Sequence, residues 1–377
     1  MPNLYDSILK TQHLVEARGN ALADDLVKML EDARTTVVGK LAELQAKYLT
    51  GAPWDMESYA RRKAFLEAQR AEIDRIIAQV YQGMTQPALD AIQDVMEHVA
   101  LATGKEFAAL KIEPSAGVNQ PNIRPVAPLG SFQLSLPAVA AWAEVHTIEG
   151  LVLTEWLGTM SKNSVNRIVA AGREAMILGL SVQDTAKLMR QKGIEGGVNA
   201  VRSLARTYLL SASNHAHEQV YEANRDIIGH LRYNAVLDGR TCLLCGNDDG
   251  KLFRLDEPRP TLQRHINCRC MYTPVVDWEK MGIPGLADND RSRPAVKETA
   301  RTVHHRDGTT STKFTVAEVD HTGENYNAWI TRQLKEDPAF VKRVLRKTRF
   351  ELFESGHISL EKMVVDGRIR RLSEISN

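Results

Sequence analysis

The sequence predicts a mainly α-helical protein, with long N-terminal helices and a central helical domain, followed by a small β module and a small C-terminal α+β unit. Three observations lead to this fold class. Apolar residues recur every three or four positions through most of the first 228 residues, which is the period of an amphipathic helix. Strand-like alternation begins only near residue 230, and all four cysteines lie between residues 242 and 270.

One long helix is expected over residues 4–50, because its apolar side chains form a single stripe. The members of this stripe are Leu22, Leu26, Leu30, Ala33, Val37, Leu41, Leu44 and Tyr48. The Gly51-Ala52-Pro53 break ends the helix, and Asp55 can cap the next one. A third helix is expected near Pro87, since proline suits the first turn of a helix. Residues 1–112 are therefore predicted to form an N-terminal helical arm or bundle.

A Pro-rich linker is predicted over residues 113–137, which contain five prolines and two glycines. Residues 138–229 return to a helical pattern and are predicted to form a central helical core. Within this core, Ser181-Val182-Gln183-Asp184 has the form of a capping box at the start of a helix. A longer helix with an apolar stripe is expected from Val201 to Ala223.

Residues 230–276 are predicted to form a small β module. Alternating apolar residues from Leu231 to Ala235 indicate a strand that ends at a turn, Asp238-Gly239. Further strands are expected at Lys251–Arg254 and Met271–Val276. A segment of this size buries little apolar surface, so it needs an additional staple to stay folded.

A polar linker is expected over residues 277–300, before a C-terminal α+β unit over residues 301–377. This unit is expected to start with a hairpin over residues 302–320. Helices near residues 325–336 and 338–354 should follow the hairpin. Turns are expected at Asp307-Gly308 and Asp366-Gly367.

The cysteines form two short motifs, Cys242-Leu-Leu-Cys245 and His265-Ile-Asn-Cys268-Arg-Cys270. Two thiolates at this spacing, followed about twenty residues later by a second set, are typical of a zinc site. The five candidate ligands exceed by one the four that Zn²⁺ needs. One of the five is therefore unused, contacts the ligands without binding the metal itself, or forms a disulfide. We expect a structural Zn²⁺ that staples the β module, because closed cysteine and histidine sites are usually structural.

Two other states of these cysteines remain open. Four cysteines can form two disulfides, which would suit an oxidising compartment. They can also stay as four unmodified buried thiols, although cysteines scattered through a core would not share one short window. The first residues, Met1-Pro2-Asn3-Leu4-Tyr5-Asp6, have neither a basic end nor an apolar core, so no secretory signal is expected.

The sequence has no phosphate loop, no dinucleotide glycine pattern and no serine elbow, and we expect no enzymatic activity. His215-Ala-His217-Glu218 is expected to be a polar helix face, because residues 215 and 217 point about 200° apart on a helix. The pair His304-His305 is expected to be polar in the same way. A nuclease built around the zinc module remains open. Its candidate groups near the metal in sequence are Asp238, Asp248, Asp249 and His265.

Positive and negative charges are nearly balanced, with a formal net charge of +1, so no global basic surface indicates nucleic acid. The last long predicted helix is nevertheless basic. Its charged residues either form a solvated face or contact phosphate or an acidic partner; they are Lys342, Arg343, Arg346, Lys347 and Arg349. No apolar run approaches the roughly 18 residues of a membrane-spanning helix, so no membrane segment is expected.

Several short motifs follow one another in a characteristic order. They are Ala205-Arg206-Thr207, Ser213-Asn214, Tyr221-Glu222-Ala223-Asn224, Leu237-Asp238-Gly239-Arg240-Thr241-Cys242-Leu-Leu-Cys245, Asp249-Gly250 and His265-Ile-Asn-Cys268-Arg-Cys270. As an ordered set, these motifs resemble the tailed-phage head-morphogenesis proteins, also called Mu F-like or minor head proteins. The stretch from Phe340 to Phe353 is similar to the same family. The resemblance covers roughly residues 150–377 and does not extend to residues 1–140.

The resemblance implies a structural minor capsid protein of a tailed phage, with residues 138–229 as its head-morphogenesis core. Such a protein would lie at or near the portal inside the head and act in head assembly and in DNA packaging or ejection. Its implied partners are the portal protein and other head proteins, with packaged DNA as a further candidate. It would be present in several copies in the virion, after assembly in the host cytoplasm.

Alternatives remain open both for the roles of individual residues and for the function of the protein. Arg206 and Thr207 fit either a buried salt bridge and cap within the helix or a docking contact to another subunit. The alternative function is a nucleic-acid-binding or nicking module that uses the zinc unit and the basic C-terminal helix. An enzyme delivered into the host is a third reading, since some relatives carry enzymatic tails.

Overall fold

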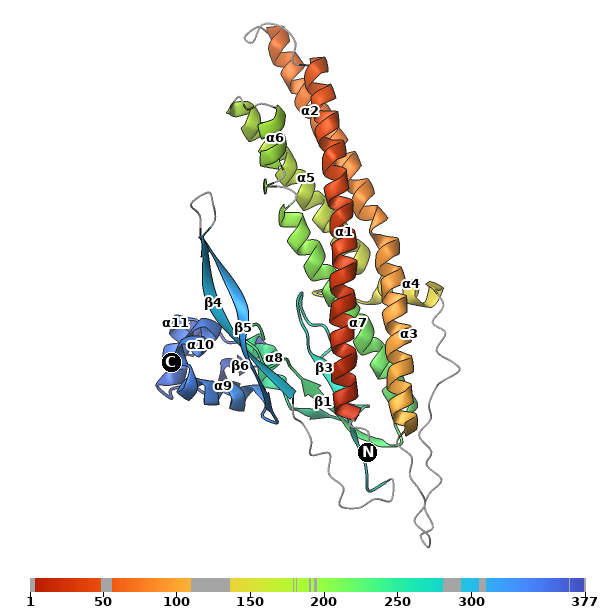
Figure 1. Ribbon diagram of the computed structural model, residues 1–377, viewed down its shortest axis with the longest axis vertical. Coiled ribbons are helices and arrows are strands. Elements are labelled where there is room, and N and C mark those ends of the chain that lie inside the picture. The colour runs from red at the N-terminus through yellow and green to blue at the C-terminus, as the bar shows by residue number, and fades with distance from the viewer. Residues whose placement is uncertain are drawn as a thin grey trace.

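The computed structural model describes residues 4–48, 56–109, 136–178, 180, 182–189, 191–192, 195–280, 293–304, 310–365 and 367–375. Most of the expected Pro-rich linker, the Ser181 cap and the turn at Asp307-Gly308 lie outside these residues. The described chain is elongated: a long helical arm stands on a small sheet, and a C-terminal lobe lies beside them (Figure 1). Mainly helical structure with small antiparallel sheets is the fold class that the sequence predicts.

The N-terminal segment forms an extended arm. Helix α1 covers Leu4–Tyr48, α2 covers Met56–Gly83 and α3 covers Thr85–Ala109. Helices α2 and α3 are nearly continuous, because Met84 N donates to Val80 O at 3.1 Å and Ala88 N donates to Met84 O at 3.2 Å. Pro87 has no N–H for this ladder, which accounts for a break at this point. The two helices run end to end, antiparallel to α1 (Figure 1).

The central helices pack on this arm. They are α4 (Leu136–Val145), α5 (Leu153–Ile177), α6 (Val182–Met189) and α7 (Glu195–Ala223). A Cβ added at Gly19 of α1 would lie 3.2 Å from Cα of Arg206 on α7, so the two helices approach closely. One hydrophobic core crosses the predicted boundary between the arm and the central helices. Its members include Leu26, Leu30, Ile73, Ile77, Ile92, Val95, Ile168, Val201, Leu204 and Tyr208.

The β module forms at the base of the arm. Strand β1 (Ile228–Asn234) lies between β2 (Leu252–Phe253) and β3 (Met271–Val276), and both pairings are antiparallel. All three strands were expected from the sequence. The short helix α8 (Leu243–Asp248) was not. A second core joins this sheet to the start of α1 and the ends of α3 and α7. It includes Leu4, Ile8, Phe107, Val220, Tyr221, Leu231, Tyr233, Cys245, Cys268 and Cys270.

The C-terminal lobe begins with a long hairpin of β4 (Arg293–His304) and β5 (Thr310–Thr322). The hairpin was expected, but its first strand starts inside the segment predicted as a linker. Helix α9 (Tyr326–Glu336) follows as predicted. The remaining elements are α10 (Pro338–Leu345), α11 (Lys347–Glu354), the 3₁₀ turns η2 (Glu361–Met363) and η3 (Leu372–Glu374), and the pair β6 (Val364–Val365) and β7 (Arg368–Ile369).

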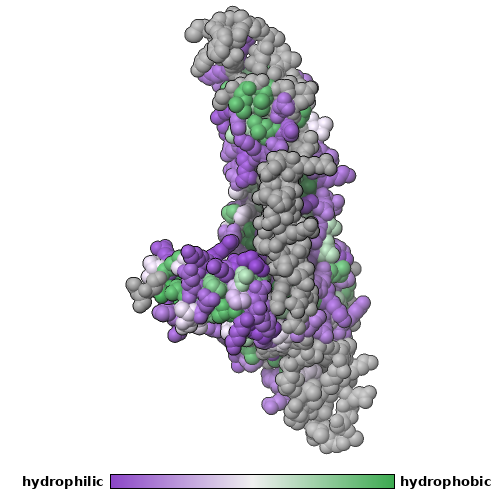
Figure 2. Space-filling model, turned by 60° about the vertical axis from the view of Figure 1, so that its left-hand side comes forward, coloured by the Kyte–Doolittle hydropathy of each residue, from purple (hydrophilic) through white to green (hydrophobic). Residues whose placement is uncertain are grey.

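The predicted single helix over residues 338–354 is wrong. Arg346 has a left-handed backbone (φ 66°) and separates α10 from α11. The lobe has its own aromatic core, which includes Trp329 and Phe340. Figure 2 shows it standing out from the elongated body, with mostly hydrophilic residues on its surface. Among the described residues, no helix combines the length and the apolar character that crossing a bilayer requires.

Candidate metal centre

The first cysteine motif lies at the start of α8. Cys242 is the N-cap residue of this helix, and its sulfur accepts a hydrogen bond from Cys245 N at 3.4 Å. Gly246 N donates to Cys242 O at 2.9 Å and closes the first turn. The turn places the side chains of Cys242 and Cys245 on one side of the helix start. An N–H bond to a cysteine sulfur also favours the thiolate form that binds a metal.

The second motif lies in the loop before β3. Cys268 N donates to His265 O at 3.0 Å, which closes a tight turn between these two residues. Asn267 within the turn has a left-handed backbone (φ 64°), a conformation that asparagine tolerates better than most residues. Cys270 follows the turn, immediately before the first residue of β3. The loop thus directs His265, Cys268 and Cys270 towards the first motif.

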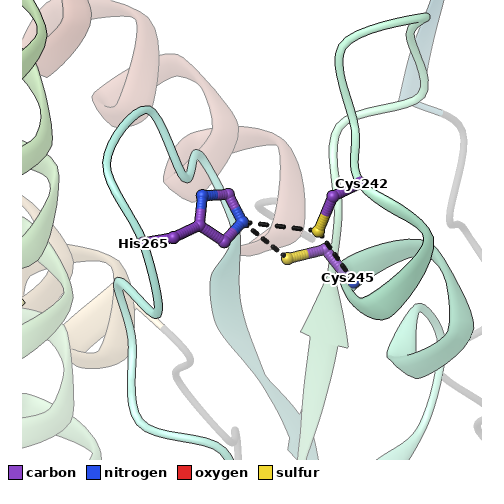
Figure 3. Close-up of side chains that lie close together, drawn as sticks. All are labelled: Cys242, Cys245 and His265. Atoms are coloured by element: carbon purple, nitrogen blue, oxygen red, sulfur yellow. Dashed lines mark hydrogen bonds between the residues drawn. The ribbon is translucent and has the colours of Figure 1, made fainter. Parts of the chain in front are cut away.

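The two motifs meet around Cys245. His265 Nε2 lies 3.4 Å from Cys242 Sγ and 3.6 Å from Cys245 Sγ, and Figure 3 shows this ring nitrogen facing both sulfur atoms. The ligand atoms of Cys242, Cys245 and His265 lie within 4.8 Å of one another, and so do those of Cys245, Cys268 and Cys270. The structure therefore brings together all five candidate ligands, in two groups that share Cys245. All four cysteines are free thiols.

The second ring nitrogen of His265 fixes the orientation of the imidazole. Nδ1 lies 2.9 Å from Ile266 O, a distance at which Nδ1–H donates to the carbonyl. Metal-bound histidines commonly hold their other nitrogen in this way, which leaves Nε2 for the metal. Three of the four thiols, those of Cys245, Cys268 and Cys270, are buried in the second core. The donor set and its enclosure fit a closed structural zinc site.

The thiols shift one another's pKa values. A hydrogen bond from Cys245, helped by His265, lowers the pKa of Cys242 to about 4. Hydrogen bonds from Cys245 and Cys270 lower the pKa of Cys268 to about 2. Donation to Cys242 and Cys268 raises the pKa of the Cys245 thiol, and the bond to Cys242 raises the pKa of His265 to about 9. Two thiolates are thus available to a cation, and binding of the ion releases the remaining protons.

Helix α7 holds the second ligand loop in place. Thr207, Ser211 and Asn214 lie on one face of this helix, at the spacing that aligns side chains along a helix. Thr207 Oγ1 accepts from Asn267 N at 2.9 Å. Ser211 Oγ donates to Leu262 O at 3.3 Å, and Asn214 Nδ2 donates to Cys270 O at 3.0 Å. Thr207 is fully buried, so it serves as an anchor for this loop within the chain.

Arg206 has a different environment from the predicted salt bridge. Its side chain is half-buried and Nε donates to Arg202 O at 3.2 Å. Burial lowers the pKa of Arg206, and the nearby charges of Arg202 and Arg240 lower it further. Its guanidinium thus donates to a backbone carbonyl, and the nearby carboxylate of Glu16 opposes the lowering of its pKa.

The acidic residues near the candidate metal centre are bound to arginines. Asp238 accepts from both terminal nitrogens of Arg269, at 2.7 and 2.8 Å. Asp249 is buried, forms an ion pair with Arg293, and accepts from Ala235 N and Tyr326 N at 2.8 and 2.6 Å. Asp248 pairs with Arg264 and Lys251. From the sequence, these three carboxylates are candidate nuclease groups. In the structure each of them forms an ion pair with an arginine of the protein.

The prediction of a polar face for the histidines of α7 is wrong for His217. This residue is fully buried, its Nδ1 lies 3.0 Å from Thr103 Oγ1, and its ring stacks on Tyr221. The helical spacing predicts which way the side chain of His217 points. It does not predict that α3 packs on that side of α7 and buries the ring. His215 is only partly buried and lines a polar cavity of about 310 Å³ with Trp142, His146, Ser211, Glu218 and Arg259.

The basic residues of the C-terminal lobe are divided between two helices. Lys342 and Arg343 belong to α10, where their cationic groups lie 5.8 Å and 5.6 Å from the rings of Phe350 and Phe340. Arg346 forms the break, and Lys347 and Arg349 belong to α11. Arg349 donates to Arg370 O at 3.2 Å. These five residues therefore do not form one continuous helix face.

The described residues thus combine a helical arm, a cysteine-rich β module and carboxylates that are bound to arginines. Residues 166–273 match a family model described as Phage Mu protein F like protein, so this part of the chain is similar to that family. The match indicates a phage head morphogenesis protein that is located in the virion. Comparison with curated proteins and with solved structures gives no match.

The matched segment runs from within α5 into β3. It contains α6, α7, β1, α8, β2 and all five candidate ligands. It also contains Thr207, Asn214 and Asp238, which hold the two ligand motifs. The resemblance drawn from these motifs is confirmed over this segment.

Proposed function

We propose that this protein is a structural minor capsid protein that acts through contacts and has no enzymatic role. In this proposal it lies at or near the portal inside the phage head and acts in head assembly and in DNA packaging or ejection. Its partners are the portal protein and other head proteins, it is present in several copies, and it is assembled in the host cytoplasm. A structural Zn²⁺ holds its β module.

The observation that carries this proposal is that the family match contains the whole candidate metal centre. The ligand loop is also tied to other parts of the chain. Gln12 of α1 donates to Arg269 O at 2.8 Å, and the buried pair of Asp249 and Arg293 connects the module to the C-terminal lobe. A metal bound here would stabilise the junction between the arm, the central helices and the lobe.

Co-assembly with the portal tests this function. The chain would be expressed with the major capsid protein, once with and once without the portal protein of the same phage, and the particles would be separated by sedimentation. We expect the chain in portal-containing particles and a strong reduction in portal-free shells. Equal amounts in both kinds of particle would contradict binding at the portal. Absence from both would contradict a capsid role.

Nucleic-acid binding is the second candidate, and one observation favours it. Lys342, Arg346 and Lys347 are exposed and have no ion pair with another residue of the described chain. We expect any DNA retention to weaken steeply with salt, because phosphate contacts release counterions. Lys342→Ala with Arg346→Ala should then reduce the salt slope by about two. Lys40→Ala, which alters a residue paired with Glu43 on α1, is the control and should leave the slope unchanged.

Plasmid cleavage separates binding from nicking. The purified chain would be incubated with supercoiled plasmid and divalent metal. We expect no conversion to nicked plasmid, because the acidic residues beside the candidate metal centre are bound to arginines. Metal-dependent nicking that is lost in His265→Ala would contradict the structural role.

A further inference from the structure

We infer that one ion is held by Cys242, Cys245, His265 and Cys268, and that Cys270 is a buried neighbour and not a ligand. This inference rests on the proposed structural zinc and identifies its ligands. The sequence leaves five candidates for four positions, and both groups of close ligand atoms include Cys245. The question is which donors complete the tetrahedron around it.

Two distances support His265 as a ligand. In a zinc tetrahedron with Zn–S of about 2.3 Å and Zn–N of about 2.05 Å, a nitrogen and a sulfur ligand lie about 3.6 Å apart. His265 Nε2 lies 3.4 Å from Cys242 Sγ and 3.6 Å from Cys245 Sγ. Both separations are close to those of a zinc tetrahedron, and the sulfur atoms of Cys242 and Cys245 lie within 4.8 Å of each other.

Charge also supports His265. One Zn²⁺ with four thiolates would leave a net charge of −2 in the second core, whereas three thiolates and a neutral imidazole leave −1. A buried charge is costly unless an opposite charge compensates it. The nearby arginines, Arg264, Arg269 and Arg293, are already paired with Asp248, Asp238 and Asp249. The ligand set with the smaller net charge is therefore favoured.

The backbone distinguishes Cys268 from Cys270. Cys268 shares a closed turn with His265, through the 3.0 Å bond from Cys268 N to His265 O. The spacing of His265 and Cys268 repeats that of Cys242 and Cys245, so two turns with the same three-residue step face each other. Cys270 lies beyond this turn, and Asn214 and Gln263 hold its carbonyl at 3.0 Å and 2.9 Å. Cys270 is buried in the second core, as Cys245 and Cys268 are, and in this assignment it acts there as a small apolar side chain.

A matched pair of variants tests the assignment. The full-length chain, Cys268→Ser and Cys270→Ser would be loaded with Zn²⁺ and analysed for metal per chain, and with Co²⁺ for the thiolate-to-metal absorption bands. We expect one ion per chain in both the full-length chain and Cys270→Ser. Their Co²⁺ absorption bands should have equal intensity, and their metal affinities should differ by less than about tenfold. Cys268→Ser should lose stoichiometric metal, and so should His265→Ala.

Other results would overturn the assignment. Loss of metal from Cys270→Ser and from Cys270→Ala, with metal retained in Cys268→Ser, would make Cys270 the ligand. Far-UV circular dichroism of each variant identifies a loss that is due to misfolding, and Cys270→Ala gives a second test with a smaller side chain. Two ions per chain would replace one tetrahedron with a bridged pair. A full-length chain that binds no metal would contradict the zinc proposal itself, which is a distinct outcome from a wrong choice of ligands.

Discussion

Thr207 positions the ligand loop through a single hydroxyl group. Its Oγ1 donates to Ser203 O at 2.6 Å and accepts from Asn267 N at 2.9 Å. The first bond stays within α7, and the second joins this helix to the turn between His265 and Cys268. The side chain of Thr207 is fully buried, whereas Asn267 is exposed. The position of the candidate ligand loop thus depends on a residue sixty positions before Asn267 in the chain.

Thr207→Val tests this contact. Valine keeps the shape of threonine but removes the acceptor of the N–H of Asn267. This hydrogen bond is partly buried, and a typical hydrogen bond contributes about 0.5–1.5 kcal/mol. We expect a lower free energy of unfolding by about that amount in urea titrations, with weaker zinc binding.

Thr331→Val is the matched control. Thr331 makes the same bond to the carbonyl four residues earlier, to Asn327 O at 2.7 Å, but on the exposed side of α9. We expect this variant to stay within about 0.5 kcal/mol of the parent chain. Equal effects of the two substitutions would show that the contact with Asn267 contributes nothing.

At the residue level, the sequence predicted which side chains gather but not what supports them. The spacing of the cysteines and His265 indicated one cluster, and the structure brings these residues together. Asn214 and Asp238 stood in the motifs, but the sequence did not indicate their partners, because Cys270 and Arg269 lie far along the chain. The burial of His217 could not be predicted either, since helical periodicity describes one helix and Thr103 comes from another.

Helix α8 connects the metal centre to the C-terminal lobe. It packs against α9, and a Cβ added at Gly246 would lie 2.3 Å from Cδ1 of Tyr326. The ring of Tyr326 is fully buried and stacks at a tilt on Trp329. The contact therefore requires a residue without a side chain on α8, one position after the ligand Cys245.

Gly246→Ala should disturb this contact. The added methyl group overlaps a rigid buried ring, so α8 or α9 must move, and overpacking of this kind typically costs about 1–3 kcal/mol. We expect a lower midpoint of thermal unfolding and faster proteolysis between β3 and α9. The fluorescence of Trp329 reports the change in the lobe.

Gly39→Ala is the corresponding control on α1. A Cβ at this position has no atom within 4 Å, and alanine favours helix by up to about 1 kcal/mol over glycine. We expect an unchanged or higher midpoint. A decrease equal to that of Gly246→Ala would mean that the ring of Tyr326 is not the cause.

The long helices could be predicted from the sequence, but the short helix α8 and the break between α10 and α11 could not. Helices α1, α2, α3 and α7 have apolar stripes that extend over many turns, which makes their period clear. Helix α8 is six residues long, too short for a periodic pattern. The division between α10 and α11 arises at one left-handed residue, Arg346, which has no glycine or proline to mark it.

At the scale of the whole molecule, the metal centre should control the base of the structure. Removal of zinc with a chelator should unfold the β module, because structural zinc contributes on the order of 10 kcal/mol in small modules. We expect protease cleavage within residues 230–276 and retention of most far-UV helical signal, since the first core contains none of the ligands. Restored resistance on addition of Zn²⁺ is the control. Unchanged cleavage in the metal-free chain would contradict the staple.

Stability should also fall with acidification. Burial lowers the pKa of His217 to about 3, below the ordinary value of about 6.5. The unfolded chain therefore binds the proton first, so the stabilisation is complete above pH 6.5 and is lost as the pH falls towards 3. For this fully buried histidine the slope is about 1.4 kcal/mol per pH unit. Burial also lowers the pKa of His146, to about 4. This histidine should therefore add to the loss of stability at acidic pH.

Urea titrations between pH 4 and 7 measure this dependence. His217→Gln removes the titrating group and should reduce the slope by about one proton. His13→Gln is the control, because His13 is exposed on α1. An identical slope in the parent chain and in His217→Gln would exclude a contribution from His217.

The position of α1 gives the molecule a mechanical property. This helix starts beside the metal centre, where Gln12 bonds to the ligand loop, and its 45 residues span about 68 Å at 1.5 Å per residue. A tilt of about 5° at the base would move the far end by about 6 Å, given this length. If a metal is bound at this centre, small adjustments around it would be amplified along the helix into larger displacements at its far end.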